Sequence, residues 1–258
     1  MRISPNVFSA IAAGLAIILL SACGREEPET AVSDGGIAMD GDDMAGVVLS
    51  AAGPEAGVWV IAETADFDTR FARIVVTDDE GRYLVPDLPD ANYQLWVRGY
   101  GLQDSRKVAA SPGDGVDLVA IVAPDAASAA QVYPAAYWYS MLGLPTEEEV
   151  ATIPGGLNNY LMWTKNMGCV GCHQMGQLST RTLPDGYGIE ESSQEAWARR
   201  IASGQAGNSM VRIAAQGLQG LPIKYLADWT DRIAAGEIPA QVPERPSGVE
   251  RNVVATVR

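Results

Sequence analysis

The chain has 258 residues, and its 32 acidic against 18 basic side chains give a net charge of −14 at neutral pH. This length allows one or two domains with hydrophobic cores of their own. The acidity argues against nucleic-acid binding, because few cations are available to neutralise phosphates. One histidine and three cysteines are too few for a histidine-rich metal site or a disulfide framework. These four residues are therefore the first candidates for chemistry.

The N-terminus has the pattern of an export signal. Arg2 precedes a short apolar run over residues 7–20, which is typical of a secretory signal peptide and short for a bilayer span; an uncleaved anchor is the alternative. The segment Leu-Ser-Ala-Cys that ends at Cys23 resembles a bacterial lipobox. This resemblance implies a signal peptide over residues 1–22 and lipid on Cys23. Several acyl chains anchor a protein stably, so we expect a lipoprotein at a bacterial membrane, facing the periplasm or the cell surface.

The segment that follows, residues 23–44, is acidic, rich in glycine and nearly free of large apolar side chains. Such a segment buries too little surface to offset its ordering entropy. We therefore predict a flexible tether between the membrane and the folded part.

Residues 45–123 show a repeating strand pattern. Short runs of alternating apolar and polar residues are separated by turn residues, of which Asp78-Asp79-Glu80-Gly81 is the clearest group. Six or seven such strands predict a β-sandwich. The order of motif residues resembles the carboxypeptidase regulatory-like (transthyretin-like) domain, and it is carried by Gly57, Val58, Val60, Thr77, Asp78, Gly81, Tyr83, Leu88, Pro89, Tyr93, Leu95, Val97, Arg98 and Gly99. That resemblance implies an accessory module, either docking or spacing, without catalysis.

Residues 169–173 read Cys-Val-Gly-Cys-His, the attachment signature of c-type haem. Two thiols at this spacing reach two vinyl groups of one porphyrin, and the adjacent imidazole becomes the proximal iron ligand. A zinc site would need further ligands, and a thioredoxin-like motif would need a βαβ setting that the pattern lacks. We therefore predict one haem c, attached to Cys169 and Cys172 and ligated by His173.

Helical patterns surround this motif. After a connector over residues 124–145, Thr146 caps an acidic first turn. The helical segments are expected at residues 157–167, from Ser192 to Gly204–Gly207, and from about Pro222 to Gly236. This order resembles a small class I cytochrome c over residues 146–240, which implies an all-α haem domain with Trp229 packed near Tyr160.

The sixth iron ligand cannot be a second histidine of this chain. A methionine thioether is the usual alternative and raises the potential. Met175 is only two residues beyond His173, on the same side of the haem, whereas Met210 lies in a glycine-containing loop between two helices. We therefore predict Met210 as the distal ligand, although methionine is also a common core residue.

The last segment, residues 241–258, reads as a linker followed by an isolated strand. A lone strand leaves its backbone unpaired. The strand either adds to a sheet edge or begins a continuation of the chain, and the combination of parts weakly resembles the N-terminal region of larger secreted proteins with a β-propeller of the streptogramin lyase family.

The predicted fold class is multidomain, an all-β sandwich followed by an all-α cytochrome c domain. The predicted function is single-electron transfer between redox partner proteins, by a carrier rather than a catalyst, anchored to the membrane by lipid and without nucleic-acid partners. Two alternatives stay open. The haem part could be the electron outlet or N-terminal part of a larger periplasmic dehydrogenase or propeller enzyme, or the β-domain could be a polysaccharide- or protein-binding module with a peripheral haem.

Overall fold

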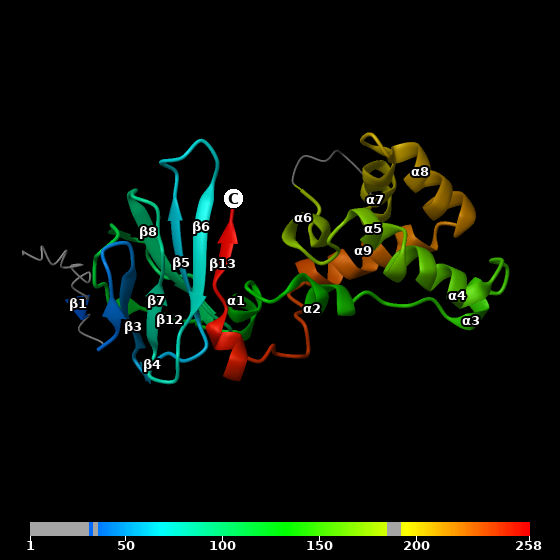
Figure 1. The fold of residues 1–258 in the computed structure, drawn as a ribbon. Helices are drawn as coiled ribbons and strands as arrows, with labels where there is room; N and C mark the ends of the chain where they lie inside the picture. The colour runs from blue at the N-terminus through cyan, green and yellow to red at the C-terminus, as the bar shows by residue number, and fades with distance from the viewer. Residues whose placement is uncertain (1–30, 33–35, 185–191) are drawn as a thin grey trace, which may run out of the picture.

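The computed structural model describes residues 31–32, 36–184 and 192–258. A β-rich part occupies the first half of the chain and a helical part the second half, and the last strand returns to the β-rich part (Figure 1). The predicted signal peptide and Cys23 lie outside the described residues. Across the described ranges, no helix is both long enough and apolar enough to cross a bilayer.

The strands of the β-rich part are short, and the turn residues recognised in the sequence separate many of them. Their bounds are β1 Ala31–Val32, β2 Ala38–Met39, β3 Met44–Ser50, β4 Gly53–Pro54, β5 Trp59–Thr64, β6 Phe71–Val76, β7 Arg82–Val85, β8 Tyr93–Arg98, β9 Leu102–Gln103, β10 Val108–Ala110, β11 Leu118–Val119, β12 Ile121–Val122 and β13 Ala255–Val257.

Two sheets enclose the core of this part. One has the strand order β10-β8-β5-β6-β13, and the other has the order β11-β3-β4, with β7 also paired to β3. Alternate residues of β8, namely Tyr93, Leu95 and Val97, are fully buried and pack against Met44 and Val48 of the opposite sheet. The period-two pattern of the sequence therefore gives each of these strands one apolar face toward a shared core.

The helical part contains mostly short helices. Their bounds are α1 Ala126–Ala130, α2 Ala135–Ser140, α3 Glu147–Val150, α4 Gly156–Leu161, α5 Cys169–Cys172, α6 Leu178–Arg181, α7 Ser193–Ala202, α8 Gly207–Val211 and α9 Leu221–Ala234, with π-helical turns at Met162–Asn166 (η1) and Arg212–Gly217 (η2) and a 3₁₀ turn at Gly248–Asn252 (η3).

Local capping chemistry explains where several helices begin. The Thr146 hydroxyl accepts from the backbone N–H of Glu149, whose side chain accepts from the Thr146 N–H, so α3 starts with a complete capping box. Ser192 accepts from the N–H of Glu195 at the start of α7, and Pro222 occupies the first turn of α9. The predicted starts of these three helices are confirmed.

The predicted fold class, an all-β sandwich followed by an all-α cytochrome c domain, is wrong. The helical part does not follow a completed β-domain, because β13 comes after it and pairs antiparallel with β6, with Ala255 opposite Ile74. The structure consists of β-sheets and a helical part that lies between strands β12 and β13 in the sequence. An all-α cytochrome c domain is not shown. The physical reason is the terminal strand, whose unpaired backbone groups find partners along the free edge of β6.

The packing of the last helix also differs from the prediction. The ring of Trp229 on α9 contacts Tyr139, with centroids 6.0 Å apart, and its Nε1–H donates to the carbonyl oxygen of Trp138 at 2.9 Å. Tyr160 instead contacts Tyr225, one turn earlier on α9, at 6.3 Å. The expected pairing of Trp229 with Tyr160 is therefore wrong by one helical turn, which the spacing of apolar residues does not determine.

The acidic segment before β3 is partly built into the fold, contrary to the predicted flexible tether over residues 23–44. The backbone N–H of Leu88 donates to the Asp42 carbonyl oxygen at 2.7 Å, and the N–H of Asp87 donates to the Asp43 carboxylate at 3.2 Å. Met39 in β2 is buried. Its few apolar side chains and its backbone groups find partners in the β-rich part, which composition alone does not reveal.

The chain leaves the helical part and returns to the sheets through Arg245. Its Nη1 contacts the Glu55 carboxylate at 2.6 Å and its Nε–H donates to the Tyr100 carbonyl oxygen at 2.9 Å. The Glu55 side chain in this ion pair is only 9% exposed. Tyr100 also packs on Tyr133, with ring centroids 6.0 Å apart, so an aromatic contact and an ion pair join the two parts.

We expect Arg245→Ala to lower the free energy of unfolding by about 3–5 kcal/mol, because it leaves the buried Glu55 carboxylate without its cation. The matched control is Arg251→Ala, whose ion-pair partner Asp79 is 78% exposed; this change should cost about 1 kcal/mol or less. Urea unfolding of both variants measures the two costs. Equal costs would contradict the role given to the Arg245–Glu55 pair.

Candidate functional site

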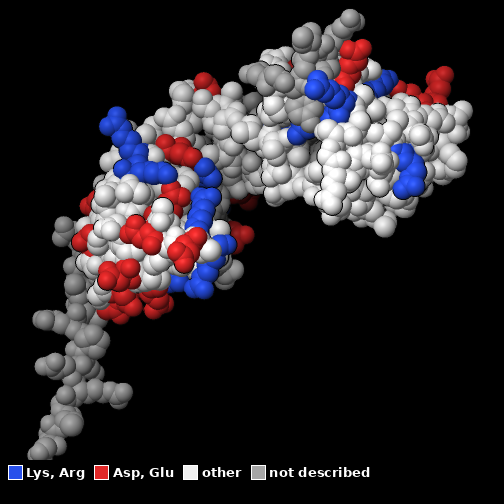
Figure 2. All heavy atoms as spheres, turned by 90° about the horizontal axis from the view of Figure 1, so that it is seen from above, with Lys and Arg blue, Asp and Glu red and all other residues white. Residues whose placement is uncertain are grey.

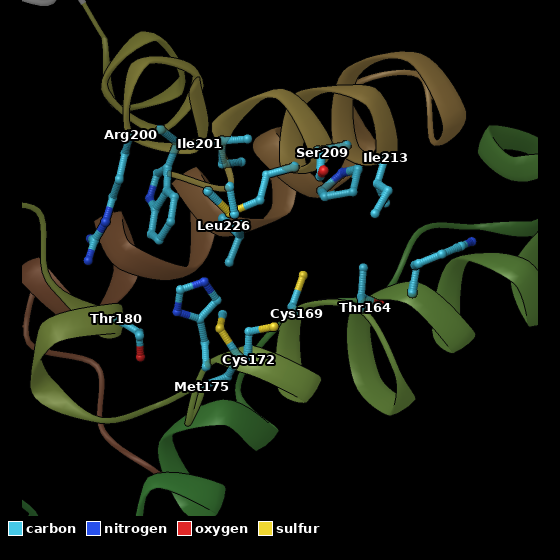
Figure 3. A pocket seen from close by; sticks show the side chains of 18 of the residues that line it. Thr164, Cys169, Cys172, Met175, Thr180, Arg200, Ile201, Ser209, Ile213 and Leu226 are labelled. Carbon is cyan, nitrogen blue, oxygen red and sulfur yellow. The ribbon is translucent and has the colours of Figure 1, made fainter. Parts of the chain in front are cut away.

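A cavity of about 550 Å³ lies in the helical part and contains the residues of the cysteine motif. Figure 3 shows Cys169, Cys172, Met175 and Thr180 on one wall, and Ile201, Ser209, Ile213 and Leu226 on the other. Two segments that are far apart in the sequence therefore face each other across it. We call this space the motif cavity.

The first wall is built by one helical turn. The N–H of His173 donates to the Cys169 carbonyl oxygen at 2.9 Å, which closes α5. Cys169 and Cys172 are three residues apart in this turn and therefore lie on one side of it. His173 follows with extended backbone angles, so its side chain departs from the helix while still lining the same cavity.

The opposite wall carries Met210, which also lines the cavity. The prediction that Met210 lies in a loop is wrong, because residues Gly207–Val211 form the short helix α8. Gly207 allows this helix to start close to the end of α7, because a Cβ there would come within 2.3 Å of the Ala202 carbonyl oxygen. The predicted residues Cys169, Cys172, His173 and Met210 are thus brought to one cavity. That these residues hold a haem and bind its iron stays a prediction.

Met175, which the sequence reasoning set aside as a ligand, lines the same cavity and is 8% exposed. It is held in place by the next residue, Gly176, whose φ of 94° and close approach to Ala135 exclude a side chain. Met175 lies beside Cys172 on the first wall (Figure 3), while Met210 comes from the second. The two methionines therefore reach the cavity from different elements.

The lining is largely apolar, and among its described residues Arg200 carries the one permanent charge. The Arg200 guanidinium lies over the Trp197 ring, 4.8 Å from its centroid, and donates to the carbonyl oxygens of Thr182, at 2.8 Å, and Ser179. These acceptors are neutral, and no carboxylate pairs with Arg200 in the part of the chain that the structure describes. Among the described residues, the positive charge at this cavity therefore has no anionic partner.

Partial burial at the first wall affects the protonation of Cys169 and of its neighbour Tyr139. Burial raises the pKa of the Cys169 thiol, which favours the neutral S–H form at neutral pH. Burial likewise raises the pKa of Tyr139, whose hydroxyl donates to the Thr164 carbonyl oxygen at 2.5 Å. Thr164 itself lines the cavity. The environment of Cys169 therefore favours the neutral thiol rather than an activated thiolate.

The described residues of the helical part do not share the overall acidity of the chain. Residues 36–125 contain sixteen acidic and six basic side chains, whereas the described residues of 126–240 contain seven of each. Figure 2 shows the same division, with acidic side chains gathered on the β-rich part and a mostly uncharged visible face on the helical part. The net charge of −14 therefore says little about the electrostatics of the motif cavity.

The residues present fit a covalently bound haem. The cavity volume lies within the range of about 300–1,000 Å³ found for cofactor sites. Two thiols, an imidazole and a thioether are available in it, the rest of the lining is largely apolar, and Arg200 offers a cation for the carboxylates of such a group. No acidic side chain among the described lining residues would repel those carboxylates.

Sequence reasoning missed Arg200, Trp197 and Thr164 as lining residues. Trp197 and Arg200 are three residues apart on α7, so they share one face of a helix whose start was predicted. That spacing was available from the sequence. The sequence did not show that this face points toward the cysteine motif, because that orientation depends on how α7 packs on α9.

Comparison with known proteins finds no matching family model and no matching curated protein. Among solved structures, one match is the crystal structure of a type II cohesin–X-dockerin complex from Acetivibrio cellulolyticus, a C-terminal interface mutant. The two chains are 14% identical with a TM-score of 0.27, and the match covers 46% of this chain and 83% of that chain. At this TM-score the likeness carries no argument about fold or function.

Glu149 holds α3 against α9, the helix that brings Leu226 to the cavity. Its carboxylate accepts hydrogen bonds from Lys224 and from the Tyr225 hydroxyl, and together with the Thr146 N–H these lower the pKa of Glu149 to about 2. Because the folded-state pKa lies below the ordinary value of 4.5, this stabilisation is present above that value and is lost as the pH falls toward 2.

We therefore expect Glu149→Gln to remove part of the acid-dependent loss of stability. Urea unfolding at several values between about pH 6.5 and pH 2.5 measures the slope. Glu148→Gln, on the same first turn, should leave the slope unchanged. A wild-type slope in the Glu149 variant would show that the carboxylate does not link α3 to α9 in solution.

Proposed function

We propose that the protein is a c-type cytochrome that transfers single electrons through one haem attached to Cys169 and Cys172. In this proposal His173 is the proximal and Met210 the distal iron ligand. Lipid on Cys23 holds the protein at the periplasmic or outer face of a bacterial membrane, where redox proteins are its partners. The observation that supports the proposal is that the four predicted haem residues line one largely apolar cavity.

The chain's own groups have distinct roles in this proposal. Bound haem supplies an iron that alternates between Fe(II) and Fe(III). Cys169 and Cys172 each add S–H across one vinyl group, so that a C–S bond forms and the hydrogen goes to the other vinyl carbon. His173 offers an imidazole nitrogen lone pair, and the Met210 thioether offers a soft sulfur that favours the reduced state.

The lining supports an electron carrier in two ways. Apolar side chains from α7 and α9, including Trp197 and Leu226, exclude water, which disfavours the more highly charged oxidised state and reduces solvent reorganisation. Arg200 would offer a cation to the carboxylates of a bound haem and offset their negative charge. Cys172 and His173 are exposed, so a redox partner can approach this side of the cavity. This activity requires no nucleophile or general base.

Attachment is tested by replacing each cysteine of the chain in a host that matures c-type cytochromes. We expect Cys169→Ala and Cys172→Ala each to retain haem through one thioether, with a shifted pyridine haemochrome band, and the double variant to retain no covalent haem. Cys23→Ala is the matched control, and it should keep the wild-type haemochrome while losing the attached lipid. Covalent haem in the double variant, or none in the wild type, would refute the proposal.

The distal ligand is tested by comparing the two cavity methionines. Met210→Ala should lose the thioether–iron charge-transfer band of the oxidised protein, because alanine removes the sulfur that the second wall presents to the cavity. Met175→Ala should keep the band, since this residue approaches from the first wall. Survival of the band in Met210→Ala together with its loss in Met175→Ala would assign the ligand to Met175 instead.

A further inference from the structure

A second cavity, of about 610 Å³, lies at the junction of the β-rich and helical parts and shares no lining residue with the motif cavity. We call it the junction cavity. Its floor is the outer face of the five-stranded sheet, and its walls come from the connector before α2 and from the returning C-terminal segment. The lining residues are Trp59, Ile61, Ile74, Val76, Arg98, Tyr100, Val132, Glu244, Pro246, Glu250, Val253 and Ala255.

The floor of this cavity is apolar because the sheet has two apolar faces. Trp59 and Ile61 on β5 lie opposite Val76 and Ile74 on β6 in the antiparallel register. These residues point away from the shared core, in which Val60 is fully buried. An outward sheet face is usually polar, so an apolar one that also lines a cavity indicates a binding surface.

Two aromatic rings form a corner of the cavity. Trp59 and Tyr100 have centroids 4.9 Å apart and planes at 83°. Tyr100 is kept in this position from behind by Tyr133, 6.0 Å away in a second edge contact. An aromatic side chain attracts alkylammonium groups through its electron-rich face, and both residues of this pair line the cavity.

The charged groups of the cavity leave it negative. Arg98 is neutralised by Asp104, with Nε and Nη2 at 2.8 and 2.6 Å from the two carboxylate oxygens. Glu250 uses one oxygen to accept from the Ser247 N–H at 3.1 Å, which leaves the other oxygen for a ligand. Glu244 is exposed and lines the same space. Two carboxylates therefore act on any group that enters.

We propose that the junction cavity binds a small organic ammonium ion, with its alkyl groups on Trp59 and Tyr100 and its charge near Glu244 and Glu250. Apolar and cation–π contacts supply one part of the attraction, and the carboxylates supply the other. A neutral saccharide would use the rings but gain nothing from the negative charge. An anion would be repelled. Charge complementarity therefore selects the cation.

The test is calorimetric titration of the full-length protein with choline, compared with dimethylbutanol, in which carbon replaces the quaternary nitrogen. We expect one-site binding of choline with a dissociation constant of about 1 mM or below, and binding of the neutral isostere that is weaker by about tenfold or more. Equal affinities, binding of neutral saccharides only, or no heat with choline up to about 20 mM would overturn the proposal.

Variants separate the two contributions. Trp59→Leu keeps an apolar side chain and removes the aromatic face, and the double change Glu244→Gln with Glu250→Gln keeps an acceptor for Ser247 while removing both charges. Each should weaken choline binding by about fivefold or more, while Glu237→Gln, on the helical part outside this cavity, should not. Unchanged far-UV circular dichroism verifies folding. Wild-type affinity in both test variants would show that choline binds elsewhere.

Discussion

The attachment of the helical part to the sheets at both of its ends is the constraint on which the rest of the structure depends. At one end the chain leaves β12 and enters α1, and at the other Arg245 contacts Glu55 before β13 pairs with β6. A part joined to its neighbour by one linker can move relative to it. A part whose second end is also fixed, by the ion pair to the buried Glu55 carboxylate and by strand pairing, keeps its position.

This constraint gives the two cavities different characters. The motif cavity lies within the helical part and depends on local elements, namely the turn of α5 and the helices that face it. The junction cavity exists only because the C-terminal segment crosses back over the outer face of the sheet and brings Glu244 and Glu250 beside Trp59. Loss of the returning C-terminal segment would leave the lining of the motif cavity intact, but it would remove one wall of the junction cavity.

Charged side chains are distributed differently in the β-rich part and in the helical part. The acidic side chains are concentrated in the β-rich part, while acidic and basic side chains balance in the described helical part. The acidity of the whole chain acts near the sheets, where it suits a cationic ligand at the junction.

The cysteine motif was recognisable in the sequence because it is local. Five consecutive residues, from Cys169 to His173, specify two thiols and an imidazole on and just after one helical turn, and no distant contact is needed to recognise them. The capping residues Thr146 and Ser192 and the turn at Asp78–Gly81 were readable for the same reason, since each satisfies backbone groups within four residues.

Only the tertiary structure decided how these local elements combine. The last strand could have continued or paired, and its place on β6 overturned the expected order of an all-β part followed by an all-α cytochrome c domain. Tyr225 rather than Trp229 meets Tyr160, and Arg200 faces the motif cavity, because helix faces are selected by packing between elements far apart in the chain. The sequence by itself determined the chemistry of the candidate site, since that chemistry is written in adjacent residues. The walls of both cavities were decided by contacts between distant segments, which no local pattern encodes.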